Sequence, residues 1–251
     1  MKKKLQLGLV LFALGFIGVL SMLTGEVPLP EEAQKVLSEV FTPWQLKLLI
    51  LINPTILLII TVIVGTLFYD KIHFKLPLIE NLVYSQKKKP VKGMLTYGIT
   101  GGLVSGLLII TMVILFMPIM PADFIELGNK FKPGPVVRFL YGGITEEILM
   151  RFGIMTLLVW LLNALSGKLT NSIYWIGILI SAVVFGILHL PVVFAMIENP
   201  TWMLIAYIIV ANTLGGIVFG WLYWKKSLET AMIAHMFAHV TMLLLENLLN
   251  L

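Results

Sequence analysis

Seven long apolar runs dominate the sequence, and their length constrains the fold more than any other feature. A helix needs about 20 mostly apolar residues to cross the hydrocarbon core of a bilayer. Runs near that length occur at residues 5–23, 48–69, 94–117, 136–162, 173–190, 202–224 and 229–251. The sequence therefore predicts an all-α, polytopic transmembrane helical bundle of about seven spans, or eight if one loop re-enters the membrane.

The composition supports this class of protein. Hydrophobic residues make up 59% of the chain and charged residues only 12%, whereas soluble domains are roughly half apolar and a quarter charged. We expect one compact helical domain, without soluble appendages, whose surroundings are the lipid bilayer. The chain has no cysteine, which excludes disulfides, thiol chemistry and cysteine-bound metal.

The basic residues predict the orientation. Lys2, Lys3 and Lys4 precede the first run, which exceeds the roughly 7–15 apolar residues of a signal peptide and lacks a small-residue cleavage site. Of the 18 basic residues, 12 fall on the side of the amino terminus, 5 on the other side, and Arg151 inside a span. Because cytoplasmic loops carry an excess of Lys and Arg, we predict a retained first span and a cytoplasmic amino terminus. The same rule explains the net charge of +5 without a nucleic-acid partner.

Glycines and a polar loop complete the outline. Gly98, Gly102 and Gly106 recur at every fourth position, and Gly216 and Gly220 repeat that spacing. Small residues so placed let membrane helices approach closely, so both sets predict packing contacts without chemistry. Residues 26–45 read as an external loop that carries a short amphipathic helix.

Ionisable residues lie inside the fourth apolar run, in the segment Thr145–Arg151. Such residues within a membrane are costly, rare and usually functional. Glu147 and Arg151 are four apart and share a helix face, whereas Glu146 is rotated by about 100° from Glu147. We therefore expect Glu147 and Arg151 to form a buried ion pair and Glu146 to face a cavity. A purely structural salt-bridge site is the alternative.

Two further runs place histidines at helical spacing. Phe185 and His189 are four apart in the fifth run, as are His235 and His239 in the seventh. A lone histidine in a span is often just hydrogen-bonded. Carboxylates and histidines from three helices can together activate a water as general base, stabilise an oxyanion, or bind zinc. Met236 replaces the glutamate of an H-E-x-x-H zinc protease, so any general base must come from the fourth span.

The motifs of the fourth, fifth and seventh runs, taken in that order, resemble those of the CPBP family. This is the Abi or type II CAAX prenyl endopeptidase family of intramembrane proteases. The motifs are Glu146-Glu147-x-x-x-Arg151, Phe185-x-x-x-His189 and His235-x-x-x-His239. The resemblance covers about residues 136–241. It implies two parts, a variable amino-terminal transmembrane part with three spans at residues 1–134 and a catalytic helical core at residues 135–251.

The resemblance implies roles for these residues. Glu146 would activate a water together with His189, Glu147 and Arg151 would support that site, and His235 would stabilise the oxyanion. His239 stands where the family often has asparagine, and it can still donate a hydrogen bond. It also completes a tentative zinc set. The four members of that set are Glu146, His189, His235 and His239. The sequence leaves the cofactor undecided between none and Zn²⁺, and the resemblance slightly favours the metal-free alternative.

The predicted function is an intramembrane endopeptidase that hydrolyses a peptide bond of a membrane-associated peptide or protein. A proton-coupled transporter is the first alternative, since intramembrane Glu, His and Arg also build proton relays. Carriers often contain internal repeats, and the glutamate motif has no counterpart elsewhere in the chain. A catalytically silent immunity or scaffold protein is the second alternative. The substrate, its prenylation and the oligomeric state are not specified by the sequence.

The depth of the motif residues conflicts with straight helices. At about 1.5 Å rise per residue, Glu146 lies about 15 Å below the outer end of its predicted span. His189 falls near the outer end of the fifth span, whereas His235 lies only about 9 Å from the inner end of the seventh. We therefore expect a span to be tilted, broken or sunk, with Gly142-Gly143 and Pro191 as the candidate positions.

Overall fold

The computed structural model describes residues 2–25, 29, 31–84 and 91–249, and within these ranges the chain is helical and without strands. The short and peripheral elements are η1 (Met22–Thr24), α2 (Glu31–Val40), α3 (Pro43–Leu49), η2 (Tyr69–Ile72), α5 (Pro77–Val83), η3 (Met117–Ile119), α7 (Ala122–Lys130), α8 (Pro135–Val137) and α11 (Leu190–Met196). The long elements are α1 (Lys2–Ser21), α4 (Ile52–Phe68), α6 (Met94–Phe116), η4 (Arg138–Glu146), η5 (Ile148–Met155), α9 (Thr156–Ser166), α10 (Asn171–Ile187), α12 (Trp202–Lys225) and α13 (Leu228–Leu249).

Seven helical segments are long and apolar enough to cross a membrane. They are Lys2–Thr24, Pro43–Ile72, Met94–Ile119, Pro135–Ser166, Asn171–Met196, Trp202–Lys225 and Leu228–Leu249. The predicted all-α bundle of seven spans is confirmed, and the protein is an integral, multi-pass membrane protein. The cytoplasmic amino terminus and the division of the chain after residue 134 stay predictions. The amphipathic helix predicted within residues 26–45 is α2.

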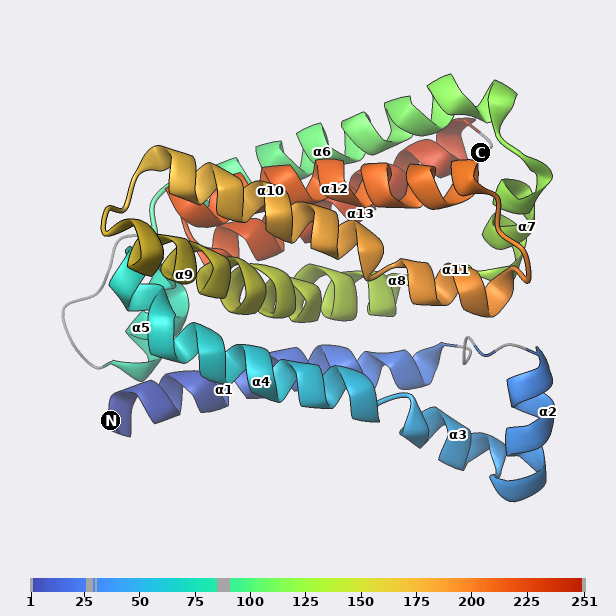
Figure 1. Cartoon of the computed structure of the whole chain (residues 1–251), viewed down its shortest axis with the longest axis horizontal. Coiled ribbons are helices and arrows are strands. Elements are labelled where there is room, and N and C mark those ends of the chain that lie inside the picture. Colours follow the sequence, from blue (N-terminus) through green and yellow to red (C-terminus); the bar gives the residue numbers. More distant parts are fainter. Residues whose placement is uncertain (1, 26–28, 30, 85–90, 250–251) are drawn as a thin grey trace.

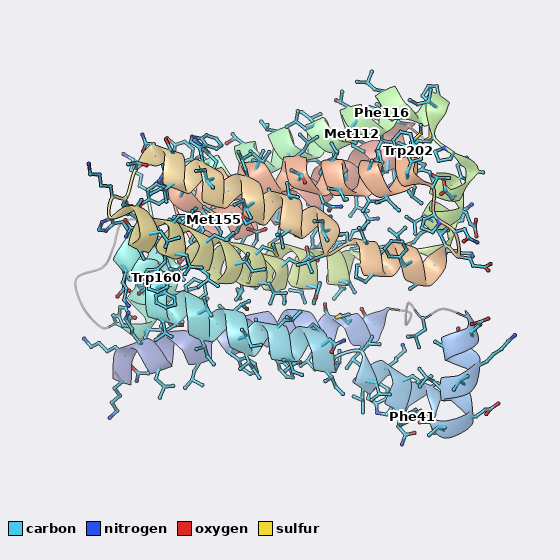
Figure 2. All side chains as sticks on the ribbon, in the orientation of Figure 1. Phe41, Met112, Phe116, Met155, Trp160 and Trp202 are labelled. Carbon is cyan, nitrogen blue, oxygen red and sulfur yellow. The ribbon has the colours of Figure 1, made fainter. Side chains whose placement is uncertain are left out.

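The fourth span lies in the middle of the bundle. In Figure 1, α1 and α4 run along one side of it, and α10, α12, α13 and α6 lie on the other side. The first span packs along η4 and the second along η5. Apolar side chains fill the interior, whereas many leucines and isoleucines of the spans stay exposed on the outer surface, as lipid contact requires. Figure 2 places Trp160 where α9 meets α4, and its ring stacks on Phe68 with centroids 4.0 Å apart.

The glycine sets bring helices into close contact, as predicted. A side chain added at Gly98, Gly102 or Gly106 of α6 would collide with α13. Gly216 and Gly220 of α12 likewise approach Ala182 and Ile178 of α10. Small residues therefore set the positions of α13 and α12, two of the helices that pack against the fourth span.

The fifth span is broken where one motif histidine lies. The helix α10 ends at Ile187, and α11 begins at Leu190 with Pro191 in its first turn. Proline has no backbone N–H to donate, but the first turn of a helix does not need one. The predicted end of this span at Leu190 is therefore wrong, because Pro191 starts a second helix, and the apolar segment continues to Met196. His189 lies at the break within the span.

The middle of the fourth span is wound as a π-helix through η4 and η5. In a π-helix the hydrogen bonds join residues five apart, and such segments occur frequently at functional sites. The Thr145 and Thr156 hydroxyls follow the same register, bonding the carbonyls of Leu140 and Arg151 at 3.4 and 3.1 Å. The wider turn separates neighbouring side chains by a smaller angle than the 100° of an α-helix.

The seventh span begins inside the fold. Ser227 caps α13, because its hydroxyl accepts from the backbone N–H of Thr230 at 3.2 Å. The next residue, Leu228, donates its N–H to the carbonyl of Lys75 at 3.1 Å. The buried Glu229 accepts from Leu78 and Ile79 at 2.9 and 3.1 Å, in the first turn of α5. The segment from η2 to α5 therefore covers the start of α13.

Candidate active site

The two glutamates lie where η4 meets η5, and their surroundings differ. Glu147 and Arg151 are fully buried, and Glu147 Oε2 is 3.3 Å from Arg151 Nε. The side chain of Glu146 is 19% exposed. The predicted pairing of Glu147 with Arg151 is present, and Glu146 is the carboxylate that keeps access to a small molecule such as water.

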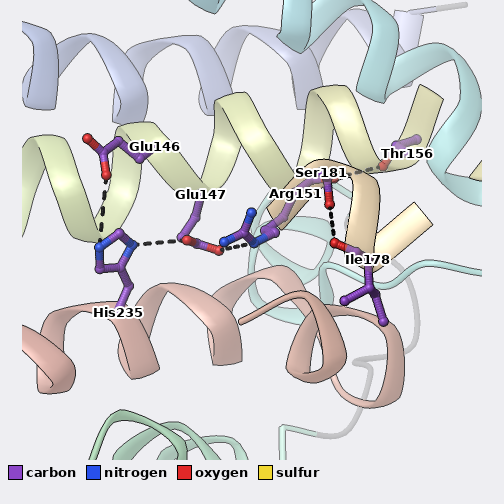
Figure 3. A network of polar contacts seen from close by, with 7 residues as sticks. All are labelled: Glu146, Glu147, Arg151, Thr156, Ile178, Ser181 and His235. Carbon is purple, nitrogen blue, oxygen red and sulfur yellow. Dashed lines mark hydrogen bonds and ion pairs between the residues drawn. The ribbon is translucent and has the colours of Figure 1, made fainter. Parts of the chain in front are cut away.

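His235 of α13 joins the two carboxylates (Figure 3). Its Nδ1 is 3.0 Å from Glu147 Oε1, and its Nε2 is 3.9 Å from Glu146 Oε2. Because an ionised carboxylate can only accept hydrogen bonds, the Nδ1 carries the proton and donates it to Glu147. That bond fixes the imidazole with Nε2 turned towards Glu146. For His235 the conflict in depth is thus absent, since the fourth and seventh spans meet at this histidine.

Two phenylalanine rings hold the cationic part of the site. Phe219 of α12 stacks on His235 with ring centroids 4.5 Å apart. The Arg151 guanidinium carbon lies 5.2 Å from the centroid of Phe185 and 5.8 Å from that of Phe219. Within the described part of the chain, its Nε, Nη1 and Nη2 have no hydrogen-bond acceptor, and the contact with Glu147 is an ion pair. Ring faces attract a buried cation. The two rings therefore stabilise the guanidinium charge, whose carboxylate neighbour is Glu147.

The remaining histidines flank this centre. His239 stacks on His235 with centroids 5.0 Å apart, and its Nε2 would lie 2.8 Å from a side chain added at Gly142. The Nδ1 of His189 bonds the Phe185 carbonyl at 2.8 Å. The structure therefore brings His235 and His239 to the fourth span. Among the described residues it shows no contact between His189 and Glu146, and the shared role of these two residues stays a prediction.

The tentative zinc set is not assembled as a metal centre. Among the described residues, no three histidine or acidic side chains are arranged so that they hold a metal ion. Both ring nitrogens of His235 face carboxylates, and His189 uses one nitrogen on a backbone carbonyl. The donor atoms present do not fit a zinc site in this arrangement, and the choice between a metal-free and a zinc mechanism is left to experiment.

Sequence reasoning missed Phe219 and assigned Gly142 a different role. Phe219 resembles any other aromatic residue of an apolar span, although it lies between the glycines at 216 and 220 that bring its helix close. Gly142 was singled out as a possible break, yet the structure uses it for the close approach of His239. No pattern in a single sequence distinguishes Phe219 from the other aromatic residues of a span. Adjacent glycines beside charged residues, in contrast, are a signal for the close approach made at Gly142.

The bundle and this buried group of acids, arginine and histidine define a polytopic membrane protein with a polar site inside the membrane. Residues 131–241 match the family model described as Rce1-like, type II CAAX prenyl endopeptidase. The family resemblance is thereby confirmed over this segment, slightly less than half of the chain, which contains all three motifs. The match supports a CAAX-protease-like intramembrane endopeptidase in general terms. No curated protein and no solved structure matches the chain.

Proposed function

We propose that this protein is an intramembrane endopeptidase in which Glu146 activates a water to hydrolyse a peptide bond of a membrane-associated peptide or protein. The observation that carries the proposal is the contact sequence Glu147–His235–Glu146, which joins the first and last motifs. The family description names a prenyl endopeptidase. A prenylated carboxy-terminal peptide is therefore the first substrate to test.

The charges suit a hydrogen-bond donor at His235. Glu146, Glu147 and Arg151 sum to one negative charge when ionised, and a protonated His235 makes the group neutral. Buried charges are tolerated when they are paired and hydrogen-bonded. In that state Nδ1–H donates to Glu147, and Nε2–H is directed to the side of Glu146.

The chemistry follows from the distance between Glu146 and His235. At 3.9 Å their atoms are too far apart for a direct hydrogen bond, so a substrate carbonyl oxygen can accept from Nε2 while a water stays on Glu146. Glu146 removes a proton as the water oxygen attacks the carbonyl carbon. His235 donates to the developing oxyanion, with His239 as the second donor. Glu146 then returns the proton to the leaving amine as the carbon–nitrogen bond breaks.

Cleavage by the purified full-length protein tests this role. Glu146→Gln keeps the shape but removes the base, so cleavage of a prenylated reporter peptide should fall by roughly 10²- to 10⁴-fold. Glu246→Gln, which removes a carboxylate elsewhere in the membrane region, should leave cleavage within about twofold of the wild type. Full activity of the Glu146 variant would exclude the mechanism. An unprenylated peptide of the same sequence shows whether the prenyl group is required, and His189→Ala tests the predicted second partner of the water.

A separate measurement addresses the metal. Activity of a preparation treated exhaustively with chelator should match that of untreated protein. Inactivation by the chelator with recovery on addition of zinc would instead establish a metalloenzyme and would replace the proposed role of Glu146 as a metal-free base.

A further inference from the structure

A cavity lies on the flank of the bundle, away from the glutamates. Its volume is about 430 Å³, within the range of roughly 300–1,000 Å³ that is typical of small-molecule sites. Three helices form its walls, and no residue of the candidate active site lines it. The lining residues are Tyr97, Thr100, Gly101 and Val104 of α6, Trp175 of α10, and Ile217, Val218, Trp221 and Leu222 of α12.

The lining is almost entirely apolar, and the cavity opens to the outer surface of the bundle. Val104 is 51% exposed, and Trp175 and Trp221 are 40% and 37% exposed. Gly101 gives the cavity depth, because a side chain added there would meet Leu222 at 2.6 Å. Because this flank belongs to three membrane-spanning segments, the medium that faces the cavity is the bilayer. Its chemistry suits an apolar chain.

Two lysines stand at one end of the cavity. Lys226 Nζ is 3.4 Å from the ring centroid of Tyr97, which lines the cavity. Lys225 Nζ is 3.4 Å from the centroid of Trp224, whose ring contacts Trp175 on the opposite wall at 6.0 Å. The aromatic contacts hold both ammonium groups near the mouth. Their donors remain able to bind an anion.

We propose that this cavity is a binding site for an anionic phospholipid of the bilayer. One acyl chain lies in the apolar groove between α6, α10 and α12, and the phosphate contacts Lys225 and Lys226. The site is complementary to such a lipid, because its positive charge lies at one end and its walls are apolar along the rest. Basic pockets between membrane helices bind anionic headgroups in this way. The proposal does not depend on the proposed peptidase activity.

Lipid binding to the full-length protein tests the assignment. Native mass spectrometry in a mild detergent compares added phosphatidylglycerol with phosphatidylcholine of identical acyl chains. Phosphatidylglycerol should bind more tightly. The double variant Lys225→Gln/Lys226→Gln should weaken its binding roughly ten- to thirty-fold, the effect of two lysines at an anionic lipid surface, and abolish the preference. Lys225→Arg/Lys226→Arg should retain it.

A matched control removes a lysine with the same kind of contact elsewhere. Lys71 Nζ lies 4.8 Å from the ring centroid of Phe68, at a distance from this cavity, so Lys71→Gln should change lipid binding less than twofold. Val104→Trp, which fills the groove from its exposed rim, should weaken binding of both lipids, with the thermal unfolding midpoint of each variant as the check on folding. Equal binding of the two lipids by the wild type would overturn the proposal. So would binding that is unchanged in the Gln double variant or in Val104→Trp.

Discussion

The two sides of α13 are held by opposite kinds of contact. Towards α6, three glycines let the backbones approach, and each of them faces both a side chain and backbone atoms of α13. Towards η4 and η5, the same helix presents His235 and His239 to carboxylates and to Gly142. One helix therefore has a close-packed side and a polar side.

The difference teaches how an ion-bearing site is positioned inside a membrane. Lipid supplies no hydrophobic force between helices, so close packing of small residues holds them together. Buried ion pairs give little net stability, because the loss of hydration offsets the attraction. We infer that the packing against α6 fixes α13 in place, and that the hydrogen bond to Glu147 sets the direction of His235.

The largest effect on stability is expected on the polar side. Arg151→Met removes the cation beside the buried Glu147, which then keeps only the contact with His235, and this should lower the free energy of unfolding by about 3–5 kcal/mol. Reversible unfolding in mixed detergent micelles measures this change. The double variant Glu147→Gln/Arg151→Met removes both charges and should recover most of the loss. If the single variant is as stable as the wild type, the pair is not a structural element.

A smaller effect is expected on the packed side. Gly102→Ala adds a side chain against Phe237 and the Ala234 carbonyl, and the resulting shift of α13 should cost about 1–3 kcal/mol. The same unfolding measurement applies. Gly128→Ala in α7, where a side chain meets nothing within 4 Å, is the matched control and should be neutral or slightly stabilising. Equal costs for the two variants would show that α6 does not position α13.

The architecture was predictable because lipid imposes a length on each span. The apolar runs predicted the seven helices, and the charged residues inside the run at 136–162 predicted where the candidate site lies. The end of the fifth span was misjudged because Pro191 is compatible both with the end of a helix and with the first turn of another. Only the structure shows that α11 follows.

The contacts within the site were harder to predict, because tertiary neighbours determine them. The segment that ends at Glu146 is wound as a π-helix, and Thr145 in that segment bonds the carbonyl of Gly15 in α1 at 2.7 Å. Helical spacing predicted the partner of Glu147 along its own helix correctly. It did not identify His235, which is 88 residues away in the chain, as the residue that joins both carboxylates.

A third substitution separates position from stability. Gly142→Ala adds an atom 2.8 Å from His239 Nε2, the end of a side chain that is able to turn away, so the free energy of unfolding should fall by less than about 1 kcal/mol. Peptidase activity should nevertheless fall by roughly tenfold or more, because small displacements of catalytic groups are costly. Reporter cleavage and unfolding are measured together. Gly134→Ala, with nothing within 4 Å, is the control, and equal activity of the two variants would exclude His239 from the oxyanion site.

The smallest effect is expected at a second ion pair between the fourth and seventh spans. Arg138 Nη1 lies 3.5 Å from Glu246 Oε2, and their side chains are 18% and 35% exposed. Glu246→Gln should cost only about 0–1 kcal/mol, since Arg138 keeps its bond to the Pro133 carbonyl at 3.1 Å. Salt should reduce this cost, because partly exposed charges are screened, while the cost of Arg151→Met should not change. Unfolding at low and high ionic strength separates the two cases. If Glu246→Gln instead lowered the free energy of unfolding by several kcal/mol regardless of salt, the two ion pairs would contribute alike. Their difference in burial would then not set their contribution to stability.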